Sequence, residues 1–210
     1  MEEGCKILID TGAPATIHNS DSLRFMGTGY TAETNYLGLT IEKLSELLGK
    51  EITTLLGCDL LSKYKILFDY NNKSVIFSDE NIDMEGTEIP IALFMGIPVI
   101  ELIIGDKKLR FYLDTGAKLS YLNKEFTENL ESAGSKEDFH PGAGKFTTCT
   151  YDIFTGLGDF NFKVKYGNLP DILQLTFLIS EIDGIIGQDF FNNFKILLDI
   201  GSKKLKYKPV

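Results

Sequence analysis

The chain carries the same tetrapeptide twice, and each copy follows an apolar run that is typical of a β-strand. Asp10–Ala13 (Asp-Thr-Gly-Ala) comes after Lys6–Ile9, and Asp114–Ala117 (Asp-Thr-Gly-Ala) comes after Arg110–Leu113. The glycine in each copy permits a tight turn, so each aspartate is expected at the end of a strand. A repeat that doubles one carboxylate suggests a site built from two carboxylates across a pseudo-twofold axis.

Two further segments match between the halves, in the same order along the chain. Leu55–Leu61 (Leu-Leu-Gly-Cys-Asp-Leu-Leu) pairs with Ile185–Phe191 (Ile-Ile-Gly-Gln-Asp-Phe-Phe), and Lys65–Asp69 pairs with Lys195–Asp199. One such match has little weight, but several in one order indicate an internal duplication.

Composition narrows the functional class. The 210 residues carry a formal charge of −9, which disfavours binding to nucleic acid or to an anionic membrane. The three cysteines, Cys5, Cys58 and Cys149, are interpreted as buried or half-buried small residues rather than a disulfide framework or a zinc site. The start Met1-Glu2-Glu3 does not resemble a secretory leader, so we expect a cytoplasmic protein.

The pattern of apolar residues predicts mostly strands with a few short helices. A helix over Ile41–Leu48 is expected, with Thr40 as N-cap and Gly49 at its end. Short helices are expected at Asp59–Tyr64 and Asp189–Phe194. The strand signals are Ile7–Ile9, Ile66–Phe68, Ser74–Phe77, Val99–Ile104, Leu109–Leu113, Phe160–Tyr166 and Leu175–Ile179.

The repeats divide the chain into two unequal lobes. We expect an N-terminal lobe over residues 1–79, an acidic linker over 80–96 and a C-terminal lobe over 97–210. Asp10 and Gly57 are 47 positions apart, whereas Asp114 and Gly187 are 73 apart. The second lobe therefore has room for a projecting hairpin that the first lobe lacks.

Taken together, these motifs resemble those of the aspartic peptidases, most closely a fused pair of retropepsin-like units. The resemblance rests on the strand with Asp-Thr-Gly-Ala, the later apolar-apolar-Gly segment and the terminal hairpin, and it covers nearly all of Lys6–Lys208. It implies an all-β, two-lobed, pseudo-twofold acid-protease fold resembling a very small pepsin. It also implies an endopeptidase whose Asp10 and Asp114, one from each lobe, activate a water molecule without metal or cofactor.

The residues beside the aspartates have roles that fit this chemistry. Thr11 and Thr115 can hydrogen-bond across the axis, while Gly12 and Gly116 leave backbone N–H groups near the carboxylates. Two close carboxyls share one proton, so one acts as base and the other as acid. Ala13 and Ala117 provide no hydroxyl to stabilise the ionised form, which predicts a mildly acidic pH optimum.

The resemblance also places a substrate-covering flap at Pro141–Tyr151 in the second lobe. Its expected tip lies near Gly144–Thr148, and we expect it to open easily. The first lobe has only Gly27–Tyr30 as a remnant. The predicted substrate-binding flap residues are Gly144, Phe146, Thr147, Thr148 and Tyr151.

Other motifs in the chain have less support than the peptidase pattern. Gly142–Lys145 superficially resembles a phosphate loop but has the wrong spacing, and His18 and His140 stand in no nucleophile motif. The alternative function is a weak or inactive peptide-binding or dimerisation module on the same fold. The expected partner is a peptide or protein substrate. A monomer is expected, with a homodimer as the alternative because the first lobe has a bare sheet edge.

Overall fold

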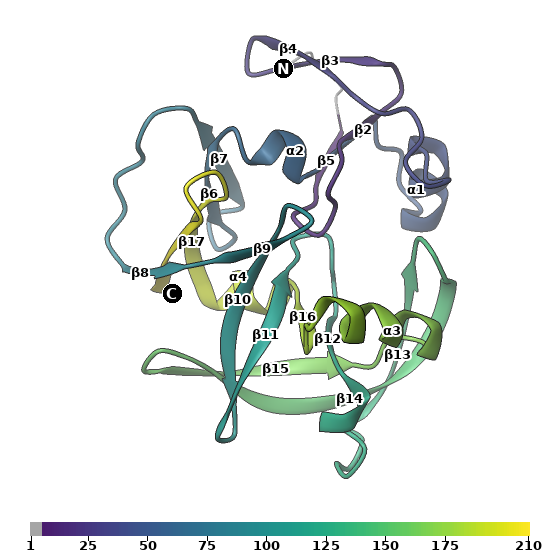
Figure 1. Cartoon of the computed structure of the whole chain (residues 1–210), viewed down its shortest axis with the longest axis vertical. Helices are drawn as coiled ribbons and strands as arrows, with labels where there is room; N and C mark the ends of the chain where they lie inside the picture. Colours follow the sequence, from purple (N-terminus) through teal and green to yellow (C-terminus); the bar gives the residue numbers. More distant parts are fainter. Residues whose placement is uncertain (1–5) are drawn as a thin grey trace.

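The computed structural model of the protein describes residues 6–210 and confirms an all-β fold with a few short helices. Two halves follow one another along the chain. In Figure 1 the N-terminal half lies at the top in purple and blue, and the C-terminal half lies below in teal and green. No helix among residues 6–210 is long and apolar enough to cross a membrane. Cys5 lies outside the described residues.

The N-terminal half contains short strands and two helices. In chain order these are β1 (Ile7–Ile9), β2 (Ile17–His18), β3 (Ser22–Phe25), β4 (Thr28–Thr31), α1 (Ile41–Leu48), β5 (Thr54–Leu56), α2 (Cys58–Leu61), β6 (Lys65–Asp69) and β7 (Ser74–Ser78).

The C-terminal half is larger and holds most of an eight-stranded sheet. Its elements are β10 (Ile97–Ile104), β11 (Lys107–Leu113), β12 (Ser120–Leu122), a 3-10 turn (Lys124–Phe126), β13 (Gly134–His140), β14 (Gly144–Leu157), β15 (Phe160–Gly167), α3 (Asp171–Ser180), β16 (Gly184–Ile186), α4 (Gln188–Asn193), β17 (Phe194–Asp199) and β18 (Lys204–Pro209).

The same three-strand arrangement occurs in both halves. β1 runs parallel to β5, which is antiparallel to β2. Likewise β11 runs parallel to β16, which is antiparallel to β12. The register is equivalent, because Ile9 pairs with Leu56 and Leu113 pairs with Ile186. The segments that match in sequence therefore form equivalent strands, with equivalent register, in the two halves.

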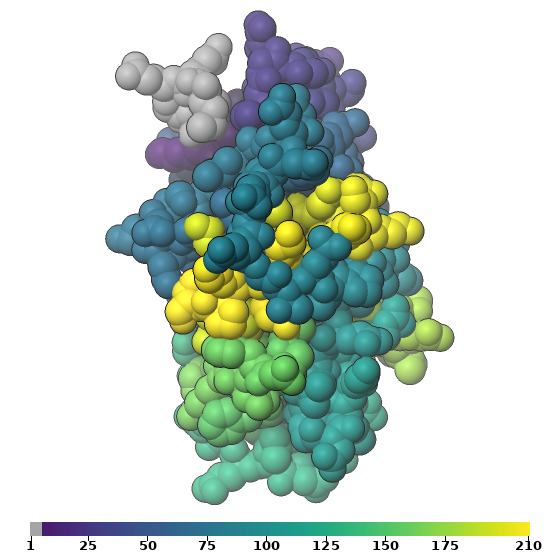
Figure 2. Space-filling view, turned by 90° about the vertical axis from the view of Figure 1, so that its left-hand side faces the viewer, coloured from purple at the N-terminus to yellow at the C-terminus, as the bar shows by residue number. Residues whose placement is uncertain are grey.

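A five-stranded sheet joins the halves, with strand order β7-β6-β17-β18-β8. β6 pairs with β17 in antiparallel fashion, so the two terminal hairpins meet edge to edge. Figure 2 shows the yellow C-terminal strands between the purple and green ends of the molecule. Phe68 and Phe191 pack across this junction with ring centroids 5.2 Å apart. One hydrophobic core runs through both halves, which holds them as a unit.

Helix α1 has the ends that its sequence predicts. The Thr40 hydroxyl accepts a hydrogen bond from the Lys43 amide at 3.4 Å, and Gly49 closes the helix at φ 63°. Ile41 and Leu44 are buried on one face. Helices α2 and α4 begin one residue earlier than expected, directly after Gly57 and Gly187.

Three expectations differ from the structure. Leu175–Ile179, expected as a strand, lies in α3, because Phe177 and Leu173 pack inward with helical spacing. The expected linker 80–96 contains β8 (Thr87–Pro90), paired with β18, and β9 (Ala92–Phe94), paired with β10. Cys149 is exposed on β14, whereas Cys58 is buried.

Candidate functional site

The two aspartates are placed by equivalent backbone contacts at the ends of β1 and β11. The Asp10 amide donates to the Leu56 carbonyl, and the Asp114 amide donates to the Ile186 carbonyl, each at 3.0 Å. Both side chains are half-buried. Because each strand end is held to its parallel neighbour in this way, the position of each aspartate is fixed. The structure brings Asp10 and Asp114 together.

Reciprocal hydrogen bonds between Thr11 and Thr115 join the two aspartate loops. The Thr11 hydroxyl donates to the Leu113 carbonyl at 2.6 Å and accepts from the Thr115 amide at 3.0 Å. The Thr115 hydroxyl donates to the Ile9 carbonyl at 2.7 Å and accepts from the Thr11 amide at 3.0 Å. Each threonine is buried, so these four bonds brace the loops from beneath.

Each glycine of the repeated tetrapeptide lies against the carboxyl of the opposite half. A side-chain carbon on Gly12 would overlap the Asp114 carboxyl, and one on Gly116 would overlap the Asp10 carboxyl. The same glycines donate backbone hydrogen bonds, Gly12 to Asp10 at 2.9 Å and Gly116 to Asp114 at 2.8 Å. The absence of a side chain is therefore what lets the two carboxyls approach.

Sequence analysis missed a second pair of supporting residues, Thr16 and Ser120. The Thr16 hydroxyl accepts from the Gly57 amide at 3.0 Å, and the Ser120 hydroxyl accepts from the Gly187 amide at 3.1 Å. Both are buried and stand six positions after their aspartates. A comparison of hydroxyl residues at equal spacing in the two halves would have identified them.

The electrostatics of the pair favour one shared proton. Burial, and then the charge of Asp114, raise the pKa of Asp10 well above its ordinary range. Burial also raises the pKa of Asp114, although N–H donors oppose this shift. Asp114 accepts from the amides of Gly116 and Ala117, at 2.8 and 3.1 Å, whereas the Asp10 carboxyl accepts from that of Gly12. The negative charge is therefore more stable on Asp114.

The dyad lies in a large cleft lined by residues of both halves. The cleft has a volume of about 1390 Å³ and includes side chains of α1, α3, β9 and the β13–β14 hairpin. Leu37, Met95 and Ile179 line it while remaining 91%, 68% and 78% exposed, respectively. An extended chain fits such a space, and the apolar side chains offer contact surface to it.

The expected flap is a hairpin of β13 and β14, and it lines the cleft. His140 pairs with Gly144, so the tip is Pro141–Ala143 rather than Gly144–Thr148. The turn falls there because Pro141 and Gly142 interrupt the strand pairing. Phe146 and Thr147 line the cleft, whereas Gly144, Thr148 and Tyr151 are not among its lining residues.

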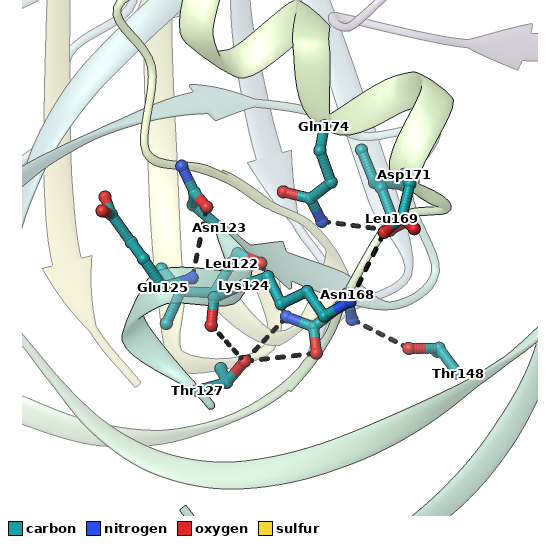
Figure 3. A network of polar contacts seen from close by, with 10 residues as sticks. All are labelled: Leu122, Asn123, Lys124, Glu125, Thr127, Thr148, Asn168, Leu169, Asp171 and Gln174. Carbon is teal, nitrogen blue, oxygen red and sulfur yellow. Dashed lines mark hydrogen bonds and ion pairs between the residues drawn. The ribbon is translucent and has the colours of Figure 1, made fainter. Parts of the chain in front are cut away.

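Thr148 belongs to a buried polar network at the base of this hairpin (Figure 3). Its hydroxyl accepts from the Asn168 amide at 2.9 Å. The Asn168 side chain donates to the Leu122 carbonyl at 3.0 Å and to the Thr127 hydroxyl at 2.9 Å. The expected substrate contact is thus a structural one, because Thr148 ties the hairpin to the end of β12.

A second unanticipated contact joins the hairpin to the site. The Tyr121 hydroxyl donates to the Asp138 carboxylate at 2.6 Å, and both residues line the cleft. Tyr121 also packs against Phe146 with ring centroids 6.2 Å apart. Burial raises the pKa of Tyr121, so the hydroxyl stays a donor to this carboxylate. The two contacts hold the inner part of the hairpin beside the dyad.

The short hairpin of the N-terminal half, unlike the β13–β14 hairpin, lies away from the cleft. Its strands β3 and β4 place Leu23 and Phe25 in the core, and Tyr30 shares a 2.7 Å hydrogen bond with Tyr64. No residue of this hairpin lines the cleft described above. In the segment Gly27–Tyr30, expected as a flap remnant, only Tyr30 packs against the body of the N-terminal half, and the other three residues are exposed.

Comparison with known proteins returns similarity at the level of structure only. No model of a known protein family matches the chain, and no curated protein matches it. A retropepsin-like aspartic protease from Rickettsia conorii matches with a TM-score of 0.41 and 21% identity, over 59% of this chain and 91% of that chain. The Simian Foamy Virus (mac) protease matches with a TM-score of 0.32 and 14% identity, over 42% and 86% respectively.

Proposed function

We propose that this protein is an aspartic endopeptidase that hydrolyses extended peptides through a water molecule activated by Asp10 and Asp114. The observation that carries the proposal is the dyad itself. Two half-buried carboxyls from equivalent loops face one another in a cleft, and the pKa of each is raised. Aspartic peptidases are known to work with two such carboxyls sharing one proton.

In the proposed reaction the two carboxyls have different roles, which their hydrogen bonds support. Asp114, with the additional N–H donor, holds the charge and removes a proton from the attacking water. Asp10 holds the shared proton and donates it toward the carbonyl oxygen of the scissile bond. The new C–O bond gives a tetrahedral gem-diol. In its collapse, Asp114 passes the proton taken from water to the nitrogen, the C–N bond breaks, and Asp10 takes back a proton from a hydroxyl of the gem-diol. The products are a carboxylic acid and an amine, and no acyl-enzyme forms.

The test is cleavage of a diverse peptide mixture, with and without a statine-type inhibitor, by the parent and by Asp10→Asn and Asp114→Asn. Each substitution removes a role that the other carboxyl cannot fill, so kcat/KM should fall at least about 10³-fold and the two losses should not add. Both variants should stay folded, because asparagine has nearly the shape of aspartate and removes a carboxyl whose charged form is disfavoured by burial.

Asp106→Asn, in the exposed turn between β10 and β11, is the matched control and should retain activity. Substantial cleavage by either dyad variant would refute the proposal. Cleavage by the parent that persists with the inhibitor would point to a contaminating enzyme. Peptide binding without cleavage by the parent would favour the binding module instead.

A further inference from the structure

The cleft has a charge balance opposite to that of the whole chain. The sequence has 30 acidic and 21 basic residues. Apart from the dyad, however, the charged residues lining the cleft are two acidic, Glu137 and Asp138, and four lysines. The lysines are Lys43, Lys50, Lys118 and Lys145. A protein that is acidic overall thus places an excess of basic groups around its cleft.

These lysines have no charged partner within the described chain. Eight ion pairs are formed among residues 6–210, and none of them uses a lysine of the cleft. All four side chains are exposed. The Asp138 carboxylate already accepts the Tyr121 hydroxyl. The positive charge of the cleft is therefore available to a ligand.

The lysines come from both halves, so positive charge lies on both walls. Lys43 is in α1 and Lys50 follows that helix, whereas Lys145 is in β14 of the hairpin. Lys118 directly follows Ala117 of the second repeated tetrapeptide. Figure 1 shows α1 and the β13–β14 hairpin on the same side of the molecule. Charges that line a cleft with low-dielectric walls act on an incoming ligand more strongly than dispersed ones.

We infer that the cleft selects peptides with acidic side chains on both sides of the scissile bond. The inference rests on the proposed function, because it takes the cleft as the site of an extended substrate. Glutamate or aspartate side chains of the substrate would pair with Lys43 and Lys50 on one wall and with Lys118 and Lys145 on the other. The dyad carries one negative charge in its working form, so the acidic side chains belong at flanking positions rather than at the scissile residues.

The first test measures binding without catalysis, in the Asp114→Asn protein. Three fluorescent peptides share one apolar core and differ only in flanks of Glu, Gln or Lys. At pH 6 and low salt the Glu peptide should bind about tenfold more tightly than the Gln peptide, as expected for a few exposed ion pairs. The ratio should approach one near 1 M salt, where the screening length is about 3 Å.

Lysine variants made in the Asp114→Asn protein test whether both walls of the cleft contribute to binding of the acidic peptide. The double variants Lys43→Gln/Lys50→Gln and Lys118→Gln/Lys145→Gln should each lower the Glu-to-Gln ratio severalfold. Lys108→Gln, an exposed lysine of β11 outside the cleft, should leave the ratio unchanged. Equal binding of the Glu and Gln peptides, tighter binding of the Lys peptide, or no binding of the Glu peptide would overturn the inference.

The second test measures cleavage of the same peptides by the parent protein. A higher kcat/KM for the Glu peptide than for the Gln peptide supports the inference. Equal cleavage of both peptides refutes the inference and leaves the proposed function standing. Selective binding of the Glu peptide with no cleavage of any peptide refutes the proposed function and supports an acid-selective peptide site.

Discussion

At the scale of single residues, the glycine of each repeated tetrapeptide is followed by alanine, Ala13 in one copy and Ala117 in the other. The Ala117 amide donates to the Asp114 carboxylate at 3.1 Å, but neither Ala13 nor Ala117 has a hydroxyl to add a further donor. Hydrogen bonds to the ionised form lower the pKa of a carboxyl, and burial raises it. In this dyad burial is the largest influence on the pKa of both aspartates.

The dyad should therefore give a bell-shaped profile of kcat/KM against pH with a mildly acidic maximum. The acid limb reports protonation of the charged carboxyl, and the basic limb reports loss of the shared proton. Because the pKa values of both aspartates are raised, both limbs lie at higher pH than for ordinary carboxyls.

Serine at position 13 or 117 supplies a hydroxyl that can donate to the adjacent aspartate. Ala13→Ser and Ala117→Ser should therefore move the profile of kcat/KM to lower pH. The check is a full pH profile of the parent beside both variants. A strongly acidic maximum in the parent, or an upward shift in the variants, would contradict this account.

At the scale of elements, α3 shows how packing decides between helix and strand. It begins after Pro170 and ends at Ser180, and the capping residue Glu181 adopts φ 53°. Phe177 is 1% exposed, whereas Ile172, Leu175, Leu178 and Ile179 are between 56% and 78% exposed. A strand would place residues 175, 177 and 179 on one face, but only the middle one of these three is buried.

Two substitutions in α3 test which of its residues is buried in the core. Phe177→Ala should lower the free energy of unfolding by about 3–5 kcal/mol, because it empties a filled core position. Leu178→Ala should change it by less than about 1 kcal/mol, because this neighbour is 75% exposed. Urea denaturation measures both values. Similar losses for the two variants would indicate that the helix does not bury Phe177.

At the scale of the whole molecule, the joint between the halves contains a partly buried ion pair. Lys195 of β17 lies 2.8 Å from Asp69 of β6, whose side chain is 8% exposed. Lys195 and the Asn72 amide group lower the pKa of Asp69 to about 2. The pair therefore holds together strands that come from different halves of the chain.

The ion pair between Asp69 and Lys195 should make the free energy of unfolding depend on pH in a defined window. A carboxyl whose pKa is lowered by folding stabilises the protein above its unfolded pKa, which is about 3.9. That contribution is lost as the pH falls from about 4 through about 2. The difference in unfolding free energy between the parent and Asp69→Asn should be roughly 2 kcal/mol near pH 6 and shrink across this window.

Asp199→Asn is the control, because Asp199 occupies the matching strand position and forms none of the ion pairs seen in residues 6–210. Denaturation at a series of pH values gives both differences. A difference for Asp69→Asn that does not change between pH 6 and pH 2 would show that the ion pair is not the source of the stabilisation.

The repeated tetrapeptides allowed the paired aspartates and the bracing threonines to be anticipated, because such turns depend on residues adjacent in sequence. The all-β fold was anticipated from the many short apolar runs and from the family resemblance. Capping of α1 by Thr40 and Gly49 was predictable for the same reason.

What the sequence by itself determined is thus the local geometry of each half and the identity of the dyad residues. The tertiary structure decided the rest: the helical state of Leu175–Ile179, the strands within 80–96 and the gathering of four lysines at one cleft. Each depends on contacts between segments far apart in the chain, and no local pattern of residues specifies which distant surface a segment will meet.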